Sequence, residues 1–350
     1  MCHTLQMKQT IFKISLIIMF LPVFFSSCKT YDYFNIEILE PAELILPRET
    51  DTLLLAHRIR PNEEDSSYTS TYKIFDYVFH DTVFIDSALA RLALSGLARS
   101  LDIYGRFTAL EVDTLRRKLP ESAAKFTEED VDYFKKMCEL APADIVVLLN
   151  RWHTSSAYDI FLNESGSNFG QFVIEIKSEW LLIDPFKSRL IDKLERDDTL
   201  YYEVNPHGLD SDSAWHKARM EALSLASRET GNRYAEQISP HYVRSSRLVF
   251  RRGDKNLKRG YDQAVEGNWK NAAIFWRKSL ASPDLKIKAM ASFNLALAGE
   301  MEGLLEPALK WAEESYGYFP DKLNATYITI LQKRIRQQED IILQMKSPQQ

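Results

Sequence analysis

Apolar and polar residues alternate along the first two thirds of the chain with two different periods. Residues 36–46 alternate in part and predict a strand that is interrupted at Pro41. Residues 52–56 and 143–149 are almost continuous apolar runs, which are typical of strands buried on both faces of a sheet. Residues 172–183 and 200–204 are rich in apolar and aromatic side chains and predict further strands.

Three helices are predicted between and after these strands. In residues 86–101 apolar side chains recur at helical spacing and form one stripe. Thr127 and Asp130 have the spacing of a capping box and predict the start of a second helix. Residues 212–238 predict a long third helix. Its expected packing side carries Ala214, Ala218, Ala222, Leu225 and Ala226. The alternation predicts one sheet with helices packed on it, as an α/β domain over residues 35–250.

Beyond residue 250 the pattern changes to helices alone, arranged as two related hairpins. Residues 267–280 align with residues 303–316, and Gly, Ala and Ser recur in register. The glycines would permit a sharp turn, the alanines a close approach of the helices, and the following prolines would end each hairpin. The residues expected to pack the repeat and to shape a partner groove are Gly267, Trp269, Ala272, Trp276, Gly303, Ala308, Trp311 and Pro320.

A last helix after Lys322 is expected to cap this repeat. Its apolar side would carry Tyr327, Leu331, Ile335, Ile342 and Met345. The fold class is therefore α+β, with an N-terminal domain of a sheet and helices at residues 35–250. An all-α domain of helical hairpins follows at residues 251–350.

The first 28 residues have the pattern of a bacterial lipoprotein signal. Lys8 and Lys13 precede an apolar stretch at residues 14–25, and two serines lead to Cys28. A membrane-spanning helix needs about 20 apolar residues, so this stretch is too short to span a membrane and suits a removed signal. Met7 is the expected start, and an ordinary secretory signal followed by an unrelated cysteine is the alternative.

Cleavage before Cys28 would make that residue the lipid anchor and the new N-terminus. Its thiol would accept a diacylglycerol, and acyl chains such as palmitate would hold the chain on a membrane. The expected segments are then a signal peptide at residues 1–27 and a lipidated tether at residues 28–34. Because residue 29 is Lys29 rather than the aspartate that retains some lipoproteins at the inner membrane, the outer membrane is favoured.

The charge of the chain argues against nucleic acid as a partner. The formal net charge is -5, and it becomes more negative once Lys8 and Lys13 leave with the signal. The three cysteines include Cys2, which is lost, and Cys28, which is lipidated. Cys138 therefore has no partner for an intramolecular disulfide or a cysteine metal site, and it is expected to pack as a small apolar residue.

The sequence contains no catalytic or metal constellation with a specific spacing. The histidines beyond the signal lack a second His or Cys at metal-ligand spacing, and His216 is expected to be a partly exposed helix residue. The aspartates at 192, 197 and 198 could bind a cation through oxygen, but a solvated hairpin is favoured. Residues 166–170 are interpreted as a turn rather than a phosphate loop. No metal and no cofactor is expected.

Two groups of surface residues can each be interpreted either as a binding site or as a structural feature. A basic cluster near the expected domain junction could pair with acidic lipids or an acidic partner, although a solvated connecting helix is favoured. Its members are Arg244, Arg247, Arg251, Arg252, Lys255, Lys258 and Arg259. The tryptophans at 269, 276 and 311 could form an aromatic shelf for a ligand, but their spacing favours packing inside the repeat.

The helical segment resembles the tetratricopeptide repeat over residues 255–321. The resemblance rests on the glycine turn, the central alanine and the terminal proline of each unit, and on Asn294-Leu295-Ala296 in a first-helix position. It implies stacked hairpins with a concave face that binds a protein or peptide partner.

Most of the mature chain also resembles a family of Bacteroidetes-type lipoproteins of unknown function. This likeness rests on Cys28, the stretch at residues 40–47, Arg58, Pro240 and the stretch at residues 267–276. In the order of its elements, the N-terminal domain resembles the lipoprotein domain of curli-secretion and peptidoglycan-synthase-activator proteins. Neither resemblance implies a reaction.

The sequence therefore predicts a non-enzymatic envelope lipoprotein that acts as a scaffold for protein interactions. It would contact the membrane through its lipid anchor and a protein or peptide partner through the helical repeat. One alternative is a subunit of an envelope secretion or assembly complex. A second is a glycan or cell-wall hydrolase with paired carboxylates, for example among Asp144, Asp159 and Glu175, although no spacing selects such a pair.

Overall fold

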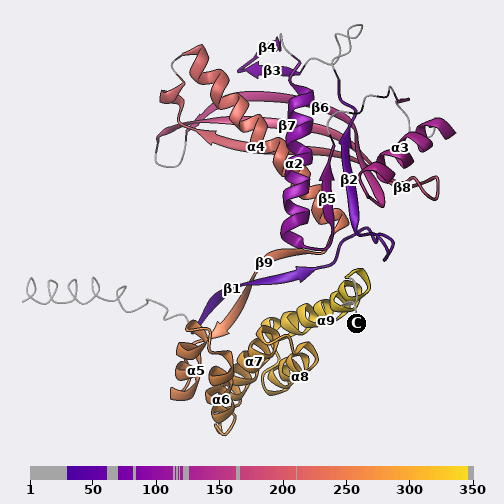
Figure 1. Cartoon of the computed structure of the whole chain (residues 1–350). Helices are drawn as coiled ribbons and strands as arrows, with labels where there is room; N and C mark the ends of the chain where they lie inside the picture. The colour runs from indigo at the N-terminus through magenta and orange to yellow at the C-terminus, as the bar shows by residue number, and fades with distance from the viewer. Residues whose placement is uncertain are drawn as a thin grey trace, which may run out of the picture. The chain divides into compact units, whose positions relative to one another are not determined.

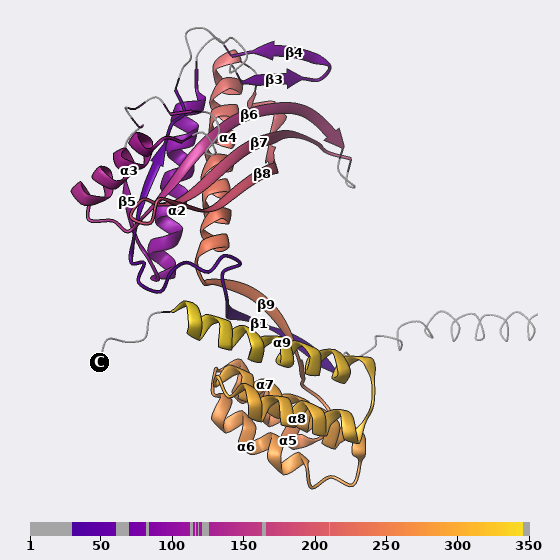
Figure 2. The same cartoon turned by 90° about the vertical axis from the view of Figure 1, so that its right-hand side faces the viewer.

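The computed structural model describes most of the chain as two compact units (Figures 1 and 2). The described residues are 30–60, 70–81, 84–112, 115, 117, 119–120, 126–162, 166–209 and 211–345. The sheet unit contains Leu39–Val243 and the residues from Gln337 onward. The helical unit contains Arg244–Arg336 and the described residues up to Ile38. Strands dominate the first unit and helices the second, which confirms the predicted α+β class with a helical C-terminal part.

The described part of the sheet unit contains a seven-stranded mixed sheet. Its strands are β2 (Thr52–His57), β3 (Thr71–Ile74), β4 (Tyr77–His80), β5 (Thr108–Glu111), β6 (Ile145–Leu162), β7 (Asn168–Asp184) and β8 (Arg189–Val204). β2 lies between β5 and β6 and is parallel to both. β6 pairs along one edge first with β2 and then with β3, and along its other edge with β7. β6, β7 and β8 form an antiparallel meander.

Helices cover both faces of the centre of this sheet, which explains the continuous apolar run of β2. Leu53 and Leu55 pack in a core with α2 (Asp86–Tyr104) and α4 (Asp212–Ile238). Leu54 and Ala56 point to the opposite face and pack in a second core with α3 (Glu128–Leu140). Because successive side chains of a strand alternate between faces, a strand covered on both sides needs apolar residues at every position.

The predicted helix signals in the sheet unit are largely confirmed. The Thr127 hydroxyl accepts a hydrogen bond from the Asp130 N–H, and the Asp130 carboxylate accepts one from the Thr127 N–H, so the capping box is complete. Burial raises the pKa of the Cys138 thiol on α3 to about 12, so this residue stays protonated and packs as an apolar group. Leu225 was wrongly placed on the packing side of α4, because 46% of it is exposed while Leu223 is buried instead.

Two segments of the sheet unit differ from the sequence prediction. Residues 189–198 continue β8 as a strand, so the predicted solvated hairpin around the three aspartates is wrong. This strand lies at the edge of the sheet, and most of its residues 189–198 are charged, which hides its period-two pattern. The hairpin of β3 and β4 was not predicted.

The described helical unit combines a two-stranded sheet with helical hairpins. The sheet pairs β1 (Tyr31–Glu40), which ends directly before Pro41, with β9 (His241–Phe250). β1 begins at Tyr31, before the predicted start at residue 36, and residues 41–46, which were predicted to follow the interruption as strand, are not part of it. The helices are α5 (Lys255–Val265), α6 (Trp269–Ser279), α7 (Leu285–Met301), α8 (Leu305–Tyr318) and α9 (Lys322–Gln344). Gly267 and Gly303 have φ values of 77° and 75°, so the turns that begin α6 and α8 use the left-handed region that glycine favours.

Two members of the basic cluster, Arg244 and Arg247, lie on β9 and not on the solvated connecting helix that was expected. Three others, Lys255, Lys258 and Arg259, are exposed on α5, in agreement with that expectation. Arg244 is exposed on β9, whereas the side chain of Arg247 is buried against α7. A strand is favoured because Leu248, Val249 and Phe250 pack into the two cores of the helical unit. The charged residues that suggested a helix flank these apolar residues, so the charge pattern does not indicate how this segment packs.

The last helix, α9, contributes residues to both units. Tyr327 and Leu331 are buried as predicted, but Ile342 and Met345 are exposed, so the predicted apolar side ends earlier. The residues from Gln337 onward belong to the sheet unit, where the Gln344 amide exchanges two hydrogen bonds with the backbone of Ala42 at 2.8 and 2.9 Å. None of the helices in the described residues is both long and apolar enough to cross a membrane.

Candidate functional site

Two glycines set the closest approach of α2 and α4. A Cβ atom built on Gly231 would lie 1.9 Å from the carbonyl oxygen of Ala93, and one built on Gly96 would lie 2.2 Å from that of Arg228. Only glycine fits at such contacts, because the backbones of the two helices almost touch. The backbone of Arg228 on α4 lies at this crossing, and α2 carries Arg99 three residues after Gly96, so the crossing brings these two arginines to neighbouring helix turns.

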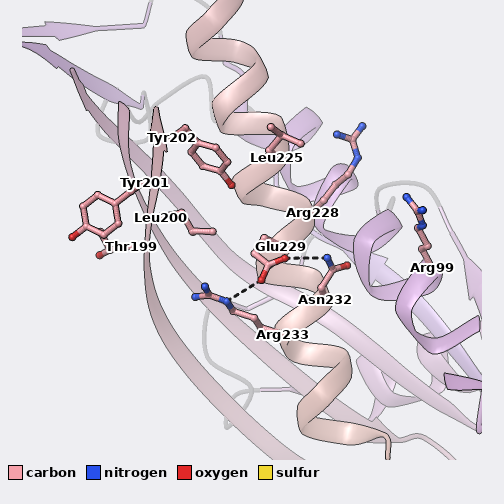
Figure 3. Close-up of a pocket in the computed structure, with 10 residues that line it drawn as sticks. All are labelled: Arg99, Thr199, Leu200, Tyr201, Tyr202, Leu225, Arg228, Glu229, Asn232 and Arg233. Atoms are coloured by element: carbon pink, nitrogen blue, oxygen red, sulfur yellow. Dashed lines mark hydrogen bonds and ion pairs between the residues drawn. The ribbon is translucent and has the colours of Figure 1, made fainter. Parts of the chain in front are cut away.

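A groove of about 580 Å³ runs beside this crossing between α4 and β8 (Figure 3). Residues from α2, α4 and β8 line it: Arg99, Thr199, Leu200, Tyr201, Tyr202, Leu225, Arg228, Glu229, Asn232 and Arg233. The lining residues on α4 are three or four positions apart, so they lie together on the exposed side of that helix. The groove is thus a surface feature of the sheet unit with both apolar and cationic side chains.

Polar contacts on the α4 side hold part of the lining in place. The Arg233 guanidinium contacts Asp198 at 2.9 Å and Glu229 at 3.3 Å. The Asn232 amide donates to Glu229 at 3.2 Å and accepts from the Ser100 hydroxyl at 3.0 Å. Figure 3 shows the two contacts of Glu229 as dashed lines. The cation of Arg233 is therefore already neutralised by acidic neighbours.

Arg99 and Arg228 differ from Arg233, because both are exposed and neither has an ion pair among the described residues. They add positive charge without an ion pair to a lining that also contains two tyrosines, Tyr201 and Tyr202. Burial, followed by the charge of Glu229, raises the pKa of the Tyr202 hydroxyl, so this group remains a neutral donor at physiological pH. Arginine and tyrosine are the side chains that dominate binding energy in protein recognition.

A second polar cluster lies between α4 and the sheet. The buried Arg219 guanidinium binds both oxygens of Asp81 at 2.7 and 2.8 Å and donates to the Ser156 hydroxyl at 2.9 Å. Nearby, Asp86 accepts a hydrogen bond from the Thr154 hydroxyl at 2.7 Å. Burial raises the pKa of Asp86 to about 6, with a smaller contribution from the charge of Asp81. These groups satisfy one another inside the unit and do not line the groove.

The predicted site residues of the repeat fall into three groups. Ala272, Trp276 and Ala308 are fully buried and pack the hairpins, so no partner can reach them in this fold. The remaining aromatic pair, Trp269 and Trp311, is half-buried against the core of α5 to α8. Gly267 and Gly303 occupy turns, and Pro320 is exposed between α8 and α9. Cys28 lies outside the described residues.

The face that α7 would offer to a partner is covered by β9 of the same unit. The Asn294 side chain exchanges two hydrogen bonds with the backbone of Phe250, at 2.7 and 2.8 Å, and the rings of Phe250 and Phe293 pack edge to face. Residues 289–298 of α7 are buried throughout. A partner on the helical repeat stays a prediction, and it would have to use a surface that β9 leaves exposed.

Sequence reasoning missed an ionic cluster at the centre of the helical unit. The fully buried Glu300 carboxylate accepts hydrogen bonds from Arg247 at 2.9 and 3.0 Å, from Arg334 at 2.6 Å and from the Tyr327 hydroxyl at 2.7 Å. These residues come from β9, α7 and α9. The only available signal was a glutamate within the otherwise apolar stretch of α7, and nothing in the sequence pairs it with residues 53 positions before and 34 positions after it.

The carboxylates considered for hydrolysis are not brought together. Asp144 precedes β6 and accepts hydrogen bonds from the N–H groups of Asp51 and Thr52 at 2.8 and 2.9 Å, which aligns β2 with β6. Asp159 lies at the other end of β6. In the strand register Glu175 lies four positions from the partner of Asp159, or about 13 Å, against the ~5–10 Å of glycosidase pairs.

No metal-binding group of three or more His, Cys, Asp or Glu side chains occurs within the described ranges. Of the aspartates considered as cation ligands, Asp198 is buried and pairs instead with Arg196 at 3.2 Å and with Arg233. His216 is exposed on α4, as predicted. Gly166 has a φ of 79° in the connection from β6 to β7, whereas residues 168–170 of the predicted turn already belong to β7.

Comparison with protein families places the sheet unit in an uncharacterised family. The model described as "Domain of unknown function (DUF8603)" matches residues 53–250, more than half of the chain. The chain therefore belongs to this family of α+β proteins. A second model, "Domain of unknown function (DUF6340)", matches residues 258–333, which cover most of the helical hairpins. No curated protein matches the chain.

Several solved structures are similar to about half of the chain. A minor lipoprotein from Acinetobacter baumannii is 8% identical, with 56% of this chain and 98% of that protein covered and a TM-score of 0.27. Rare lipoprotein B from Shewanella oneidensis is 11% identical, with coverages of 52% and 89% and a TM-score of 0.24. A PelC dodecamer from Paraburkholderia phytofirmans is 11% identical, with coverages of 59% and 99% and a TM-score of 0.23. TM-scores at this level do not establish a shared fold.

Proposed function

We propose that this protein is a lipid-anchored scaffold of the bacterial cell envelope, without catalytic activity of its own, that binds a partner protein through the groove between α4 and β8. The groove carries this proposal, because it combines two exposed arginines that lack ion pairs with tyrosine and leucine side chains. Such a surface is suited to recognition, since tyrosine contributes contact area at low entropic cost and arginine contributes hydrogen bonds and charge.

The anchor rests on the N-terminal sequence. The short apolar stretch at residues 14–25, followed by Ser26, Ser27 and Cys28, has the order that lipoprotein processing requires. Two or three acyl chains on Cys28 would bind the membrane far more strongly than one, since each buried CH₂ contributes about 0.8 kcal/mol. Lys29 at the following position favours the outer membrane as the destination.

The groove, rather than the face of α7, is proposed as the binding surface for a physical reason. α7 is already covered by β9 through the Asn294 and Glu300 contacts, and uncovering it would expose a buried ionic cluster. The groove needs no rearrangement, because Arg99, Arg228 and Leu225 are exposed in the folded unit. A preformed surface also avoids the entropic cost of ordering loops on binding.

The anchor is tested by metabolic labelling of the full-length protein with a palmitate analogue. Wild type should incorporate the label and partition into detergent, whereas Cys28→Ala should do neither. Labelling that persists in Cys28→Ala would contradict lipidation at this residue. Cys138→Ala is the matched control, because its thiol is buried and lies in the folded sheet unit; it should keep the label.

The scaffold role is tested by site-specific photocrosslinking in intact cells. A photoreactive residue at Leu225, which is 46% exposed in the groove, should give a discrete product with one envelope protein. The same residue at Leu140, which is 86% exposed at the end of α3, should not give that product. Adding Arg228→Glu to the Leu225 probe should abolish it. Identical products at both positions, or none at Leu225, would contradict binding at this groove.

A further inference from the structure

The groove between α4 and β8 borders an unpaired strand edge. Four consecutive residues of β8, 199–202, line it. Because successive side chains of a strand point to opposite faces, a groove lying on one face would be lined by alternate residues only. The groove therefore meets the backbone at the edge of β8. In the described part of the chain β8 pairs with β7 alone, so its outer edge has backbone donors and acceptors available for another strand.

The charged residues of β8 are distributed so that none lies at the edge segment 199–202. Seven of the ten residues 189–198 are charged, whereas none of residues 199–202 is. Exposed edges are usually protected against strand addition by charged side chains. The unprotected segment is Thr-Leu-Tyr-Tyr, whose residue types favour the extended conformation. Charged residues thus flank the groove segment, with Asp198 before it and Glu203 after it, but none lies within it.

The charge of the lining residues indicates which charge a ligand of the groove would carry. Arg99, Arg228 and Arg233 face a single lining carboxylate, Glu229, although the whole chain has a net charge of -5. Arg233 is paired with Glu229 and with Asp198, whereas neither Arg99 nor Arg228 forms an ion pair within the described residues. An acidic ligand would supply the missing counter-charges, and a basic ligand would be repelled.

We infer that the groove takes an extended, acidic segment of a partner protein, which adds as a strand to the edge of β8 at residues 199–202. Main-chain hydrogen bonds to this edge would supply much of the affinity. Apolar side chains on the inner face of the segment would pack on Leu225 and Tyr202, and carboxylates would reach Arg228 and Arg99. This inference rests on the proposed function and specifies the chemistry of the partner.

The inference is tested with a displayed library of random decapeptides selected on the full-length protein in detergent. Selected sequences should be enriched in Asp and Glu, should alternate acidic and apolar residues, and should be depleted in Pro, which cannot complete a strand ladder. A synthetic copy of the best sequence should lose about tenfold or more of its affinity for Arg228→Glu, since a charge pair has been replaced by a repulsion.

Two controls separate the binding mode from general electrostatics. Lys136→Glu on the exposed side of α3 changes the net charge equally and should leave affinity within about twofold, because α3 packs on the opposite face of the sheet from α4. A copy of the peptide with alternate backbone amides methylated keeps every side chain but cannot donate to β8, and it should not bind. Hydrogen exchange of the amides at residues 199–202 should slow on binding of the unmodified peptide.

Several results would overturn the inference. Selection of basic or helical sequences, equal affinity for wild type and Arg228→Glu, or full binding of the methylated peptide would each exclude an acidic added strand. A concentration-dependent dimer that Arg228→Glu dissociates would assign the groove to a second copy of this chain. If the Leu225 photocrosslink forms while acidic strands do not bind, the groove is a docking site of another kind, and only the inference fails.

Discussion

Replacing Glu300 by Gln should strongly destabilise the helical unit. The carboxylate is fully buried and is the shared acceptor of Arg247, Arg334 and Tyr327. The substitution keeps the shape of the side chain but removes its charge. It also replaces one acceptor oxygen by an NH₂ group, which would face the hydrogen-bond donors of the cluster. The Arg247 guanidinium, whose side chain is 6% exposed, would then keep a buried charge without a counter-ion.

The expected cost follows from this orphaned charge. Removing one partner of a buried ion pair costs about 3–5 kcal/mol, because the remaining ion is desolvated without compensation. Glu302→Gln is the matched control. Glu302 ends the same helix and pairs at 3.7 Å with Lys270, whose side chain is 85% exposed, so its loss should cost less than about 1 kcal/mol. Urea unfolding followed by circular dichroism and tryptophan fluorescence gives both values.

A third variant tests whether the orphaned arginine is the cause. In Glu300→Gln combined with Arg247→Met the buried cation is gone, so this double variant should be more stable than Glu300→Gln alone. A cost below about 1 kcal/mol for Glu300→Gln, or additive costs in the double variant, would refute the reasoning.

The wild-type cluster should also make the helical unit sensitive to acid. Burial alone would raise the pKa of Glu300, but the hydrogen bonds and charges of Arg247, Tyr327 and Arg334 hold the pKa below its usual value. A carboxyl with a lowered folded-state pKa stabilises the fold above its unfolded pKa, and this contribution is lost as the pH falls through the folded value. The stability difference between wild type and Glu300→Gln should therefore shrink as the pH falls below about 4.

Two further predictions concern the sheet unit. Asp86→Asn should stabilise it at pH 7 by up to about 3 kcal/mol, because the folded-state pKa of Asp86 is raised from 3.8 to about 6 and ionisation above that pH is unfavourable. The gain should vanish near pH 4 in urea titrations, and a gain that does not vary with pH would contradict this explanation. Gly231→Ala should cost about 1–3 kcal/mol, since its Cβ would meet the Ala93 carbonyl oxygen. Gly317→Ala, where nothing lies within 4 Å of the added carbon, should lower the thermal midpoint little or raise it; equal losses would refute the clash.

The groove illustrates why sequence reasoning located no binding surface in the sheet unit. Its members are separated by more than a hundred residues, from Arg99 to Arg233, and each has an ordinary role when considered alone. Leu225 was assigned to the packing side of α4 because alanine spacing does not fix the rotation of a long helix to within one position. Two unremarkable glycines, Gly96 and Gly231, decide that α2 and α4 approach closely enough to bring the arginines to adjacent turns.

The sequence by itself determined the elements whose signals are local. The apolar run of β2, the capping box of α3, the full length of α4 and the glycine turns of the helical hairpins all depend on residues within a few positions of one another. The N-terminal signal ending at Cys28 is likewise a local pattern, and it remains the basis of the proposed anchor.

Tertiary structure alone decided the long-range pairings. It placed β9 on α7, joined Arg247 to Glu300 across 53 residues, and returned Gln344 to Ala42 across 302 residues. Hydrogen bonds and ion pairs of this kind depend on which surfaces meet after the cores have formed, and hydrophobic periodicity carries no information about the partner. The edge of β8 became a candidate binding site for the same reason, because only the assembled sheet shows that residues 199–202 pair with β7 on one side and with no strand of the described chain on the other.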